Sequence, residues 1–410
     1  MNDIDSVVEI LRNRPDTRSS SVALGASISK ERLVEIYREI QKDGSILLEG
    51  SKYPEFSKTF FGVLENRKWI ENFWEYGFAY PLIVEMHLGL FCNGYCSFCF
   101  SRDAEYEEGG ELLSHSEIAD LFTELYENGV QEIWFSGGKE PFTAPLCVDS
   151  ISMANAMGFK TRVYTNGSIM DEYVCEVLLG CDQIRISASA ASQLTYGKIH
   201  GEYGASLEDI ISNVKRLLNM KRDRGSSINV GISCIIFNDN CHEIFNMVDL
   251  WRHVGVDFIQ LRGESVGQTT PLSGKDRRAV LEQISRISKG SDLGIRGLSE
   301  DDILSKDQFL VGMGRSKVCR AGVWKRGVDP FGNVWHCEFT MHPGNRFGRS
   351  SYRLGSLRKQ TFGEIIRGSV FPVDCGEPCQ QHEYGLNIQL DKLFDDLEFG
   401  ISFDDQPWSR

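Results

Sequence analysis

The chain has 410 residues, of which 41% are hydrophobic and 25% are charged, as is ordinary for a globular protein of two or three domains. Its net charge of −14 argues against nucleic acid and anionic membrane surfaces as main partners. No apolar run reaches transmembrane length, and the N-terminus carries early acidic residues without an apolar signal core. We therefore expect a cytoplasmic protein.

Residues 1–80 are charged and helical in pattern, and we expect a helical N-terminal extension. Between about 82 and 265, apolar runs alternate with helical stretches. The first such stretch begins at a capping box formed by Ser114 and Glu117. The runs typical of strands are "LIVEMHL" (82–88), "QEIWFS" (131–136), "KTRVYT" (160–165), "QIRISA" (183–188), "INVGISCIIF" (228–237) and "DFIQLR" (257–262).

About six strand–helix units of roughly thirty residues predict a parallel sheet covered by helices. Six units are too few for the closed eight-unit barrel, so we expect an α/β fold with a partial (β/α)6 TIM-like barrel at 81–270. Parallel βα folds place their chemistry at the carboxyl ends of the strands. The segment "FCNGYCSFCF" (91–100) follows the first strand and therefore falls at that edge.

The rest of the chain changes character after a helical linker predicted at 271–314. We expect a small C-terminal α+β domain at 315–385, because "RGVDPFGNVWHC" reads as a β-hairpin and "SLRKQTFGEIIRGS" as one amphipathic helix. The last segment, 386–410, is predicted to be an acidic tail.

Twelve cysteines in a reducing compartment indicate metal binding rather than disulfides where they cluster. Five are scattered and are expected to pack in the core, namely Cys147, Cys175, Cys181, Cys234 and Cys241. The clustered ones form two groups, Cys92, Cys96 and Cys99 early in the chain and Cys319, Cys337, Cys375 and Cys379 late in it.

The early group has a C-x3-C-x2-C spacing and supplies three thiolates where a closed metal site needs four ligands. One interpretation is a [4Fe-4S] cluster with one iron left open. The other is a zinc site completed by a distant residue. The position of the loop after a first strand, Phe98 before the last cysteine, and "FSGGKEP" (135–141) after the second strand favour the cluster.

These features resemble the radical S-adenosylmethionine (radical SAM) superfamily over about residues 80–265. The resemblance implies that SAM chelates the open iron. It also implies a backbone contact from Phe98 to adenine and a "GGE" turn that meets the methionine amino group. Here a lysine stands before the acid of that turn. The SAM-binding residues implied by the resemblance are Phe98, Gly137, Gly138, Glu140, Asn166 and Ser187, with a satisfied strand hydroxyl as the alternative for Ser187. Arg262, at the end of the sixth strand, is either a bidentate partner of a carboxylate or a surface arginine.

The chemistry implied by the resemblance is reductive cleavage of SAM to a 5′-deoxyadenosyl radical, which abstracts a hydrogen atom from the substrate. An external one-electron reductant such as flavodoxin or ferredoxin is then needed. Glu85 and His87 share a strand face, and His87 is a candidate base. Cys234 is a candidate hydrogen donor, and Tyr164 and Arg185 are candidate substrate contacts.

The late cysteine group provides four thiolates, enough for a second, fully ligated [4Fe-4S] cluster or for a structural zinc ion. Its order of hairpin, helix and "CGEPC" resembles the twitch domain, a short form of the SPASM domain of radical SAM enzymes. The longer form needs seven cysteines, and none follows Cys379.

Relatives with a twitch domain include modifiers of sugars and aminocyclitols. We therefore expect a carbohydrate-like or aminocyclitol substrate that undergoes dehydrogenation, epimerisation or dehydration. The alternative is a maturase that modifies a ribosomal peptide or protein, for which residues 1–80 are long enough to hold a recognition element. A non-catalytic iron–sulfur or zinc scaffold is a third reading.

Overall fold

The computed structural model describes residues 3–13, 17–42, 66–99, 101–102, 110–201, 204–264, 269, 272–287, 293–296, 321–337, 340–341, 352–369 and 381–406. The chain forms two compact units. One comprises Met1–Ala79, Phe309–Ala321 and Val370–Arg410, and the other comprises Tyr80–Gln308 and Gly322–Ser369.

The first unit is helical where the structure describes it. Its core joins the N-terminal helices to the C-terminal one: Ser19 N–H donates to the buried carboxylate of Asp396 (2.7 Å), which also pairs with Lys392. Within the segment 386–410, expected to be an acidic tail, residues 386–399 belong to the C-terminal helix. The elements are α1 (Asp3–Asn13), α2 (Ser19–Ala26), α3 (Lys30–Lys42), α5 (Arg67–Tyr76), α17 (Gln381–Phe399) and the 3-10 turn η4 (Phe403–Asp405).

The second unit contains a ten-stranded sheet in the order β10-β9-β8-β1-β2-β3-β4-β5-β6-β7. The strands from β8 through β1 to β7 run parallel, whereas β9 and β10 are antiparallel. Their bounds are β1 (Ile83–His87), β2 (Glu132–Ser136), β3 (Lys160–Thr165), β4 (Gln183–Ser187), β5 (Asn229–Ile236), β6 (Phe258–Gly263), β7 (Gly294–Arg296), β8 (Lys325–Val328), β9 (Asn333–Trp335) and β10 (Arg353–Ser356).

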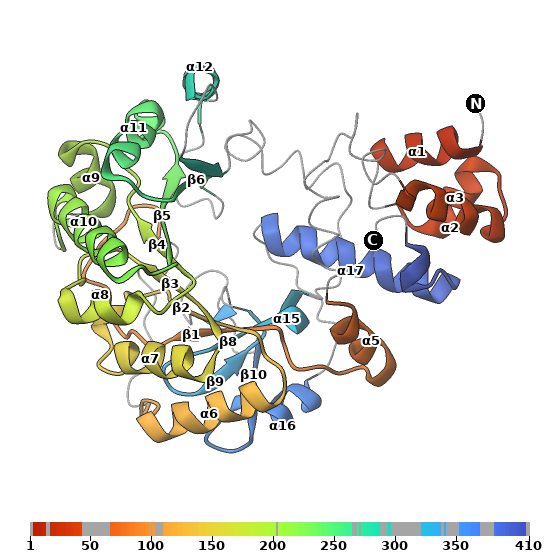
Figure 1. Ribbon diagram of the computed structural model, residues 1–410, viewed down its shortest axis with the longest axis horizontal. Coiled ribbons are helices and arrows are strands. Elements are labelled where there is room, and N and C mark those ends of the chain that lie inside the picture. The colour runs from red at the N-terminus through yellow and green to blue at the C-terminus, as the bar shows by residue number, and fades with distance from the viewer. Residues whose placement is uncertain are drawn as a thin grey trace. The chain divides into compact units, whose positions relative to one another are not determined.

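Helices follow strands β1 to β5 and line one side of the sheet (Figure 1). The capping box at Ser114 and Glu117 starts the first of them, as the sequence predicts. These helices are α6 (His115–Glu127), α7 (Cys147–Met157), α8 (Glu172–Leu178), α9 (Gln193–His200), α10 (Leu207–Arg224) and α11 (Ile244–Val254). The remaining elements are α12 (Gly274–Ile287), α15 (Ala321–Trp324), α16 (Phe362–Gly368) and the 3-10 turn η1 (Pro141–Thr143).

All six predicted strands are present within one or two residues of their expected bounds, and the sheet is not closed, which confirms the partial barrel. The hairpin predicted at "RGVDPFGNVWHC" is β8 and β9. It joins the same sheet, because β8 pairs with β1 from Ile83 to Met86. Asp329 closes the hairpin turn by accepting from the N–H groups of Phe331 and Asn333.

The two faces of the sheet differ in polarity, because neighbouring residues of a strand point to opposite faces. The helix-covered face is apolar and buried, with residues such as Val84, Phe135, Ile184 and Ile232. The alternate positions carry polar and charged side chains, among them Glu85, Arg162, Arg185 and Gln260. We call this second face the polar face.

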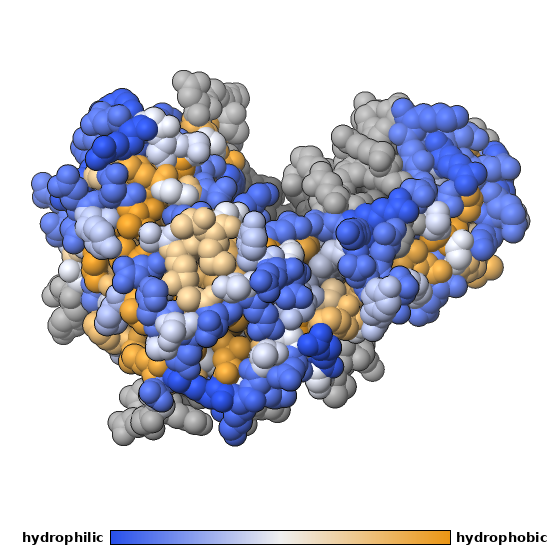
Figure 2. Space-filling view, turned by 60° about the horizontal axis from the view of Figure 1, so that its bottom comes forward, coloured by the Kyte–Doolittle hydropathy of each residue, from blue (hydrophilic) through white to orange (hydrophobic). Residues whose placement is uncertain are grey.

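Hydrophilic side chains cover most of the surface seen in Figure 2, with hydrophobic ones in scattered patches. Within the described part of the chain, no helix combines the length and the apolar character needed to cross a membrane.

Candidate functional site

The loop that carries the early cysteines lies between β1 and α6, at the carboxyl edge of the sheet. Backbone hydrogen bonds fix it against the end of α9: Tyr95 N–H donates to His200 O (2.9 Å) and Ser97 N–H to Ile199 O (2.8 Å). Gly89, at the start of the loop, is required by close packing, because a Cβ there would come within 2.4 Å of Glu140 O.

The thiols of Cys92, Cys96 and Cys99 are free and share this loop. Burial raises the pKa of each one. The thiolates of Cys99 and Cys92 raise the pKa of Cys96 further, so the three sulfur atoms lie within electrostatic reach of one another. In the described residues, no group of three or more His, Cys, Asp and Glu side chains is arranged for a single metal ion.

His200, at the C-terminal end of α9, makes a contact that sequence patterns do not show. Its Nδ1 lies 3.3 Å from Cys96 Sγ, and the backbone N–H of Ser189 donates to its Nε2 at 3.0 Å. Burial lowers the pKa of His200 to about 4, so the ring is neutral near pH 7. Because Nε2 accepts, the ring proton sits on Nδ1, which therefore donates to Cys96 Sγ.

Glu140 of the "GGKEP" turn points into the protein. Its carboxylate accepts hydrogen bonds from Thr165 Oγ1 (2.6 Å), Asn166 N–H (2.7 Å) and Phe142 N–H (3.3 Å). Burial raises the pKa of Glu140 to about 7 although these hydrogen bonds act in the opposite direction. The side chain thus ties the end of β2 to the end of β3.

The same network reaches the cysteine loop through two asparagines. Asn166 Nδ2 donates to Asn93 Oδ1 (2.7 Å), and Asn93 Nδ2 donates to Ser168 Oγ (2.8 Å). Asn93 was not among the residues predicted from the sequence. Asn93 lies between Cys92 and Cys96, and the spacing of the cysteines is the dominant pattern of that segment.

Lys139, which precedes Glu140, also contacts the cysteine loop. Lys139 Nζ donates to Ser101 O (3.2 Å) and Arg102 O (3.4 Å), just beyond Cys99. The backbone of this turn is tight, since a Cβ on Gly137 would come within 3.0 Å of Lys139 O. The extra residue therefore turns its side chain to the cysteine loop and leaves the acid to face inward.

The other predicted residues take different positions. Phe98 packs edge-on against His200 and Phe237. Ser187 ends β4 on the polar face, in register with Ser233, and Arg262 is exposed on β6. Gly137 and Gly138 follow β2, as expected.

Cys234, the candidate hydrogen donor, does not reach the polar face. It is fully buried on the helix-covered side with Ile232 and Ile236, and its thiol donates to Ala188 O at 3.0 Å. Strand parity explains the outcome: Ser233 and not Cys234 points to the polar face. The structure therefore does not bring Cys234 to the site.

His87 and Glu85 share the polar face, as their parity predicts. His87 Nε2 lies 3.0 Å from Glu85 Oε1, and Lys325 Nζ of β8 lies 3.3 Å from Glu85 Oε2. Ser136 donates to Glu85 as well. Burial would raise the pKa of Glu85, but Lys325 and the hydrogen bond from His87 outweigh it and hold the pKa below its usual value. His87 is thus part of a charged cluster.

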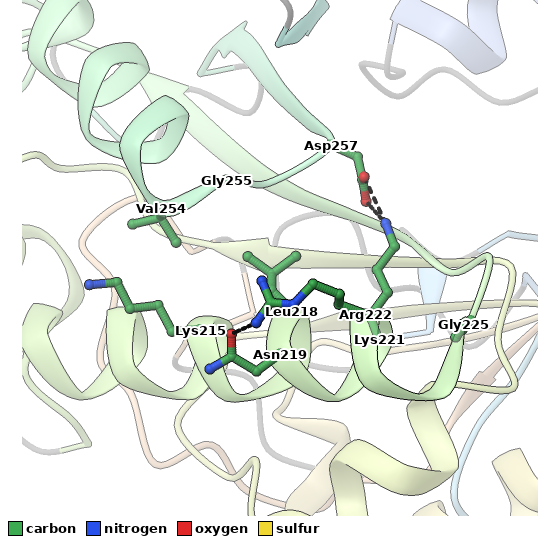
Figure 3. A pocket seen from close by; sticks show the side chains of 10 residues that line it. Lys215, Leu218, Asn219, Lys221, Arg222, Gly225, Val254, Gly255 and Asp257 are labelled. Carbon is green, nitrogen blue, oxygen red and sulfur yellow. Dashed lines mark hydrogen bonds and ion pairs between the residues drawn. The ribbon is translucent and has the colours of Figure 1, made fainter.

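A separate pocket of about 460 Å³ lies at the opposite, amino-terminal edge of the sheet (Figure 3). It is formed by α10 and by the loop between α11 and β6, with Lys221 paired to Asp257 at 2.7 Å. The ten residues that line it include neither a cysteine nor a histidine. The thiol loop, and not this pocket, is therefore the candidate active site.

Of the late cysteine group, the structure describes Cys337 alone. It follows β9, and its carbonyl accepts from Thr340 Oγ1 at 2.8 Å. Cys319, Cys375 and Cys379 lie outside the described residues.

One family model matches the part of the chain that carries the thiol loop. Residues 86–250 match the model of the radical SAM superfamily. The chain is 24% identical over 216 residues to dTDP-4-amino-4,6-dideoxy-D-glucose ammonia-lyase of Streptomyces venezuelae, covering 50% of this chain and 44% of that protein. It is 25% identical over 267 residues to PqqA peptide cyclase of Gluconobacter oxydans, covering 63% of this chain and 70% of that protein.

A solved structure shows the same fold. SuiB of Streptococcus suis, bound to S-adenosylmethionine, superposes with a TM-score of 0.53 at 16% identity, covering 73% of this chain and 68% of that one. The ammonia-lyase match spans less than half of that relative. Residues 86–250 are a radical SAM domain, and enzymes of that superfamily use a [4Fe-4S] cluster and S-adenosylmethionine.

Proposed function

We propose that Cys92, Cys96 and Cys99 hold a [4Fe-4S] cluster with one open iron, and that the enzyme abstracts a hydrogen atom from a carbohydrate-like small molecule. The observation that carries the proposal is the loop of three free thiols at the carboxyl edge of a partial barrel. Three thiolates fit the ligand chemistry of such a cluster. When bound, the cluster supplies the electron that cleaves SAM, from an external reductant such as flavodoxin or ferredoxin.

The protein's own residues position the reactants. The network of Glu140, Thr165, Asn166 and Asn93 joins the ends of β2 and β3 to the cysteine loop and so fixes the edge at which SAM is proposed to bind. Further SAM contacts proposed there come from Phe98, Gly137, Gly138, Ser187 and Arg262. The polar face supplies hydrogen-bonding groups for a substrate rich in hydroxyl groups.

His200 offers a test of the cluster assignment. A hydrogen bond from Nδ1–H to Cys96 Sγ stabilises the more negative, reduced cluster and so raises its potential. Replacing His200→Leu is expected to lower the midpoint potential by about 20–60 mV, which corresponds to about 0.5–1.5 kcal/mol in a one-electron couple. The potential is measured by redox titration with electron paramagnetic resonance.

The control for this prediction is His200→Asn, because the Nδ2 of asparagine occupies nearly the position of the histidine Nδ1 and can donate to the same sulfur. The midpoint potential of His200→Asn should therefore lie between those of His200→Leu and the wild type. Equal potentials for His200→Leu and the wild type, both carrying the cluster, would show that the contact does not act on Cys96.

The substrate class rests on the polar face and on one relative. The ammonia-lyase that the chain resembles acts on a nucleotide-linked amino sugar, as its name states. Dehydrogenation, epimerisation or dehydration are the outcomes proposed for this chain. His87 is a candidate base for a hydroxyl proton, with Glu85 beside it to stabilise the charged ring.

Isotope transfer tests the substrate class. Sugars, aminocyclitols and peptides deuterated at carbon are incubated anaerobically with the reconstituted enzyme, SAM and a reductant. We expect deuterium in 5′-deoxyadenosine from a sugar or aminocyclitol, since the radical takes its hydrogen from that carbon. Deuterium transfer from peptides alone would contradict the proposal.

A peptide or protein maturase is the second candidate function. It is favoured by the match to PqqA peptide cyclase, which covers 63% of this chain. The peptide arm of the isotope experiment decides between the two.

A second, fully ligated [4Fe-4S] cluster is proposed at Cys319, Cys337, Cys375 and Cys379, in a twitch-like domain. Support comes from the count of four thiolates in this part of the sequence. With four protein ligands the cluster has no open iron, so its proposed role is electron transfer and not substrate binding.

A further inference from the structure

The polar face of the sheet carries more positive than negative charge around Tyr164. Two of its cations are paired: Arg162 lies 3.0 Å from Glu132, and Lys325 lies 3.3 Å from Glu85. Arg185 of β4 and Arg296 of β7 differ, since neither has a carboxylate partner in the described part of the chain. In a chain of net charge −14, this local excess of positive charge needs an explanation.

The sequence brings these two arginines to the same place. Arg185 is in register with Gly231 of β5, which has no side chain, and the ring of Phe258 fills the space above it. A Cβ on Gly231 would lie within 2.2 Å of that ring. Arg185 Nη1 reaches across β5 and donates to Gln260 Oε1 of β6 at 2.9 Å.

Arg296 lies on β7, which pairs with β6 along the edge opposite to β5. Its guanidinium lies 3.9 Å from the centroid of the Phe258 ring, and its register partner on β6 is Gln260, which holds Arg185. Arg296 is exposed, and partial burial of its guanidinium lowers its pKa, as do the neighbouring charges of Arg185 and Arg162. The two guanidinium groups therefore repel each other, and no carboxylate of the described residues pairs with either of them.

Tyr164 adds a neutral donor between the strands. Its ring lies 5.2 Å from the Arg185 guanidinium, and its hydroxyl makes no hydrogen bond to any described residue. Burial raises the pKa of Tyr164, so the hydroxyl is protonated near neutral pH. Tyr164 is half-buried, so its hydroxyl is available to donate to a ligand.

We propose that Arg185, Arg296 and Tyr164 bind an oxyanion of the substrate, a phosphate or carboxylate group. Planar guanidinium groups match such anions with paired hydrogen bonds. The inference rests on the proposed function and narrows it: the hydrogen atom is taken from a substrate that carries an anionic group. The anion sits on the polar face, and the thiol loop lies at the carboxyl edge of the same sheet.

Calorimetry with full-length, reconstituted enzyme tests this site. The probes are inorganic pyrophosphate and succinate, which distinguish a phosphate from a carboxylate, with sodium chloride at equal ionic strength as the reference. Arg185→Gln and Arg296→Gln are each expected to weaken the preferred probe by about tenfold or more, the usual strength of a charged hydrogen bond. Tyr164→Phe is expected to weaken it less.

Two controls keep the result interpretable. Arg224→Gln removes an exposed arginine of α10 and should leave anion affinity unchanged. Arg185→Lys keeps the charge without the planar fork and should retain part of the affinity, which separates loss of the site from misfolding. Equal affinity in the wild type and both glutamine variants would overturn the proposal, as would no binding of either probe.

The measurement requires neither a reductant nor turnover. Failure to bind an anion and failure to cleave SAM are therefore independent results, and each refers to its own claim.

Discussion

Replacement of Cys96 by alanine is expected to abolish reductive SAM cleavage. Two thiolates cannot hold a cubane, so the variant loses the cluster that delivers the electron, and with it the hydrogen bond from His200. Iron content should fall by about four atoms per chain. The measurement is 5′-deoxyadenosine after anaerobic incubation with SAM and dithionite, which should drop to the enzyme-free level. Cys92→Ala and Cys99→Ala should behave in the same way.

A matched control is Cys181→Ala. Cys181 is a buried free cysteine after α8, near Asn155 and away from the thiol loop, so its replacement removes a sulfur without removing a proposed ligand. It should keep both iron and SAM cleavage. Undiminished 5′-deoxyadenosine formation by Cys96→Ala would refute the ligand assignment.

Replacement of Cys375 by alanine is expected to separate the two clusters. The reconstituted wild type should hold about eight iron atoms per chain and the variant about four, because a cubane contains four. SAM cleavage should persist, since the early cysteines are intact. Turnover of the substrate should fall steeply if the second cluster takes the second electron of an oxidation.

Two results bear on this prediction in different ways. About four iron atoms in the wild type would remove the second cluster altogether. Eight iron atoms with full turnover in the variant would retain the cluster and point to a redox-neutral reaction such as epimerisation.

The strands could be predicted because alternation in the sequence reports directly on the two faces of a sheet. "KTRVYT" is β3 at the expected residues, and Glu85 and His87 share a face as their parity requires. The same parity excludes Cys234 from the polar face, and the structure places its side chain among the apolar residues of the helix-covered face. The cysteine loop was predictable from its spacing and from its place after the first strand.

Long-range contacts were not predictable in this way. Nothing local at His200 indicates that the end of α9 meets Cys96, 104 residues earlier. The carboxylate of Glu140 faces inward because it accepts hydrogen bonds from a hydroxyl and an N–H group at the end of β3 and from a second N–H group in its own turn. The pairing of β8 with β1 likewise joins segments about 240 residues apart in the sequence. Such contacts form when distant parts of the chain pack together, and the periodicity of a local segment does not report them.

The central claim is that three thiols hold an open cluster which cleaves SAM. Its most direct test is the quantity of 5′-deoxyadenosine and methionine formed by iron-loaded wild-type protein with SAM and dithionite under strict exclusion of oxygen. We expect both products to appear in equal amounts and neither to appear without reductant. Recovery of intact SAM from protein that carries its full iron content would contradict it.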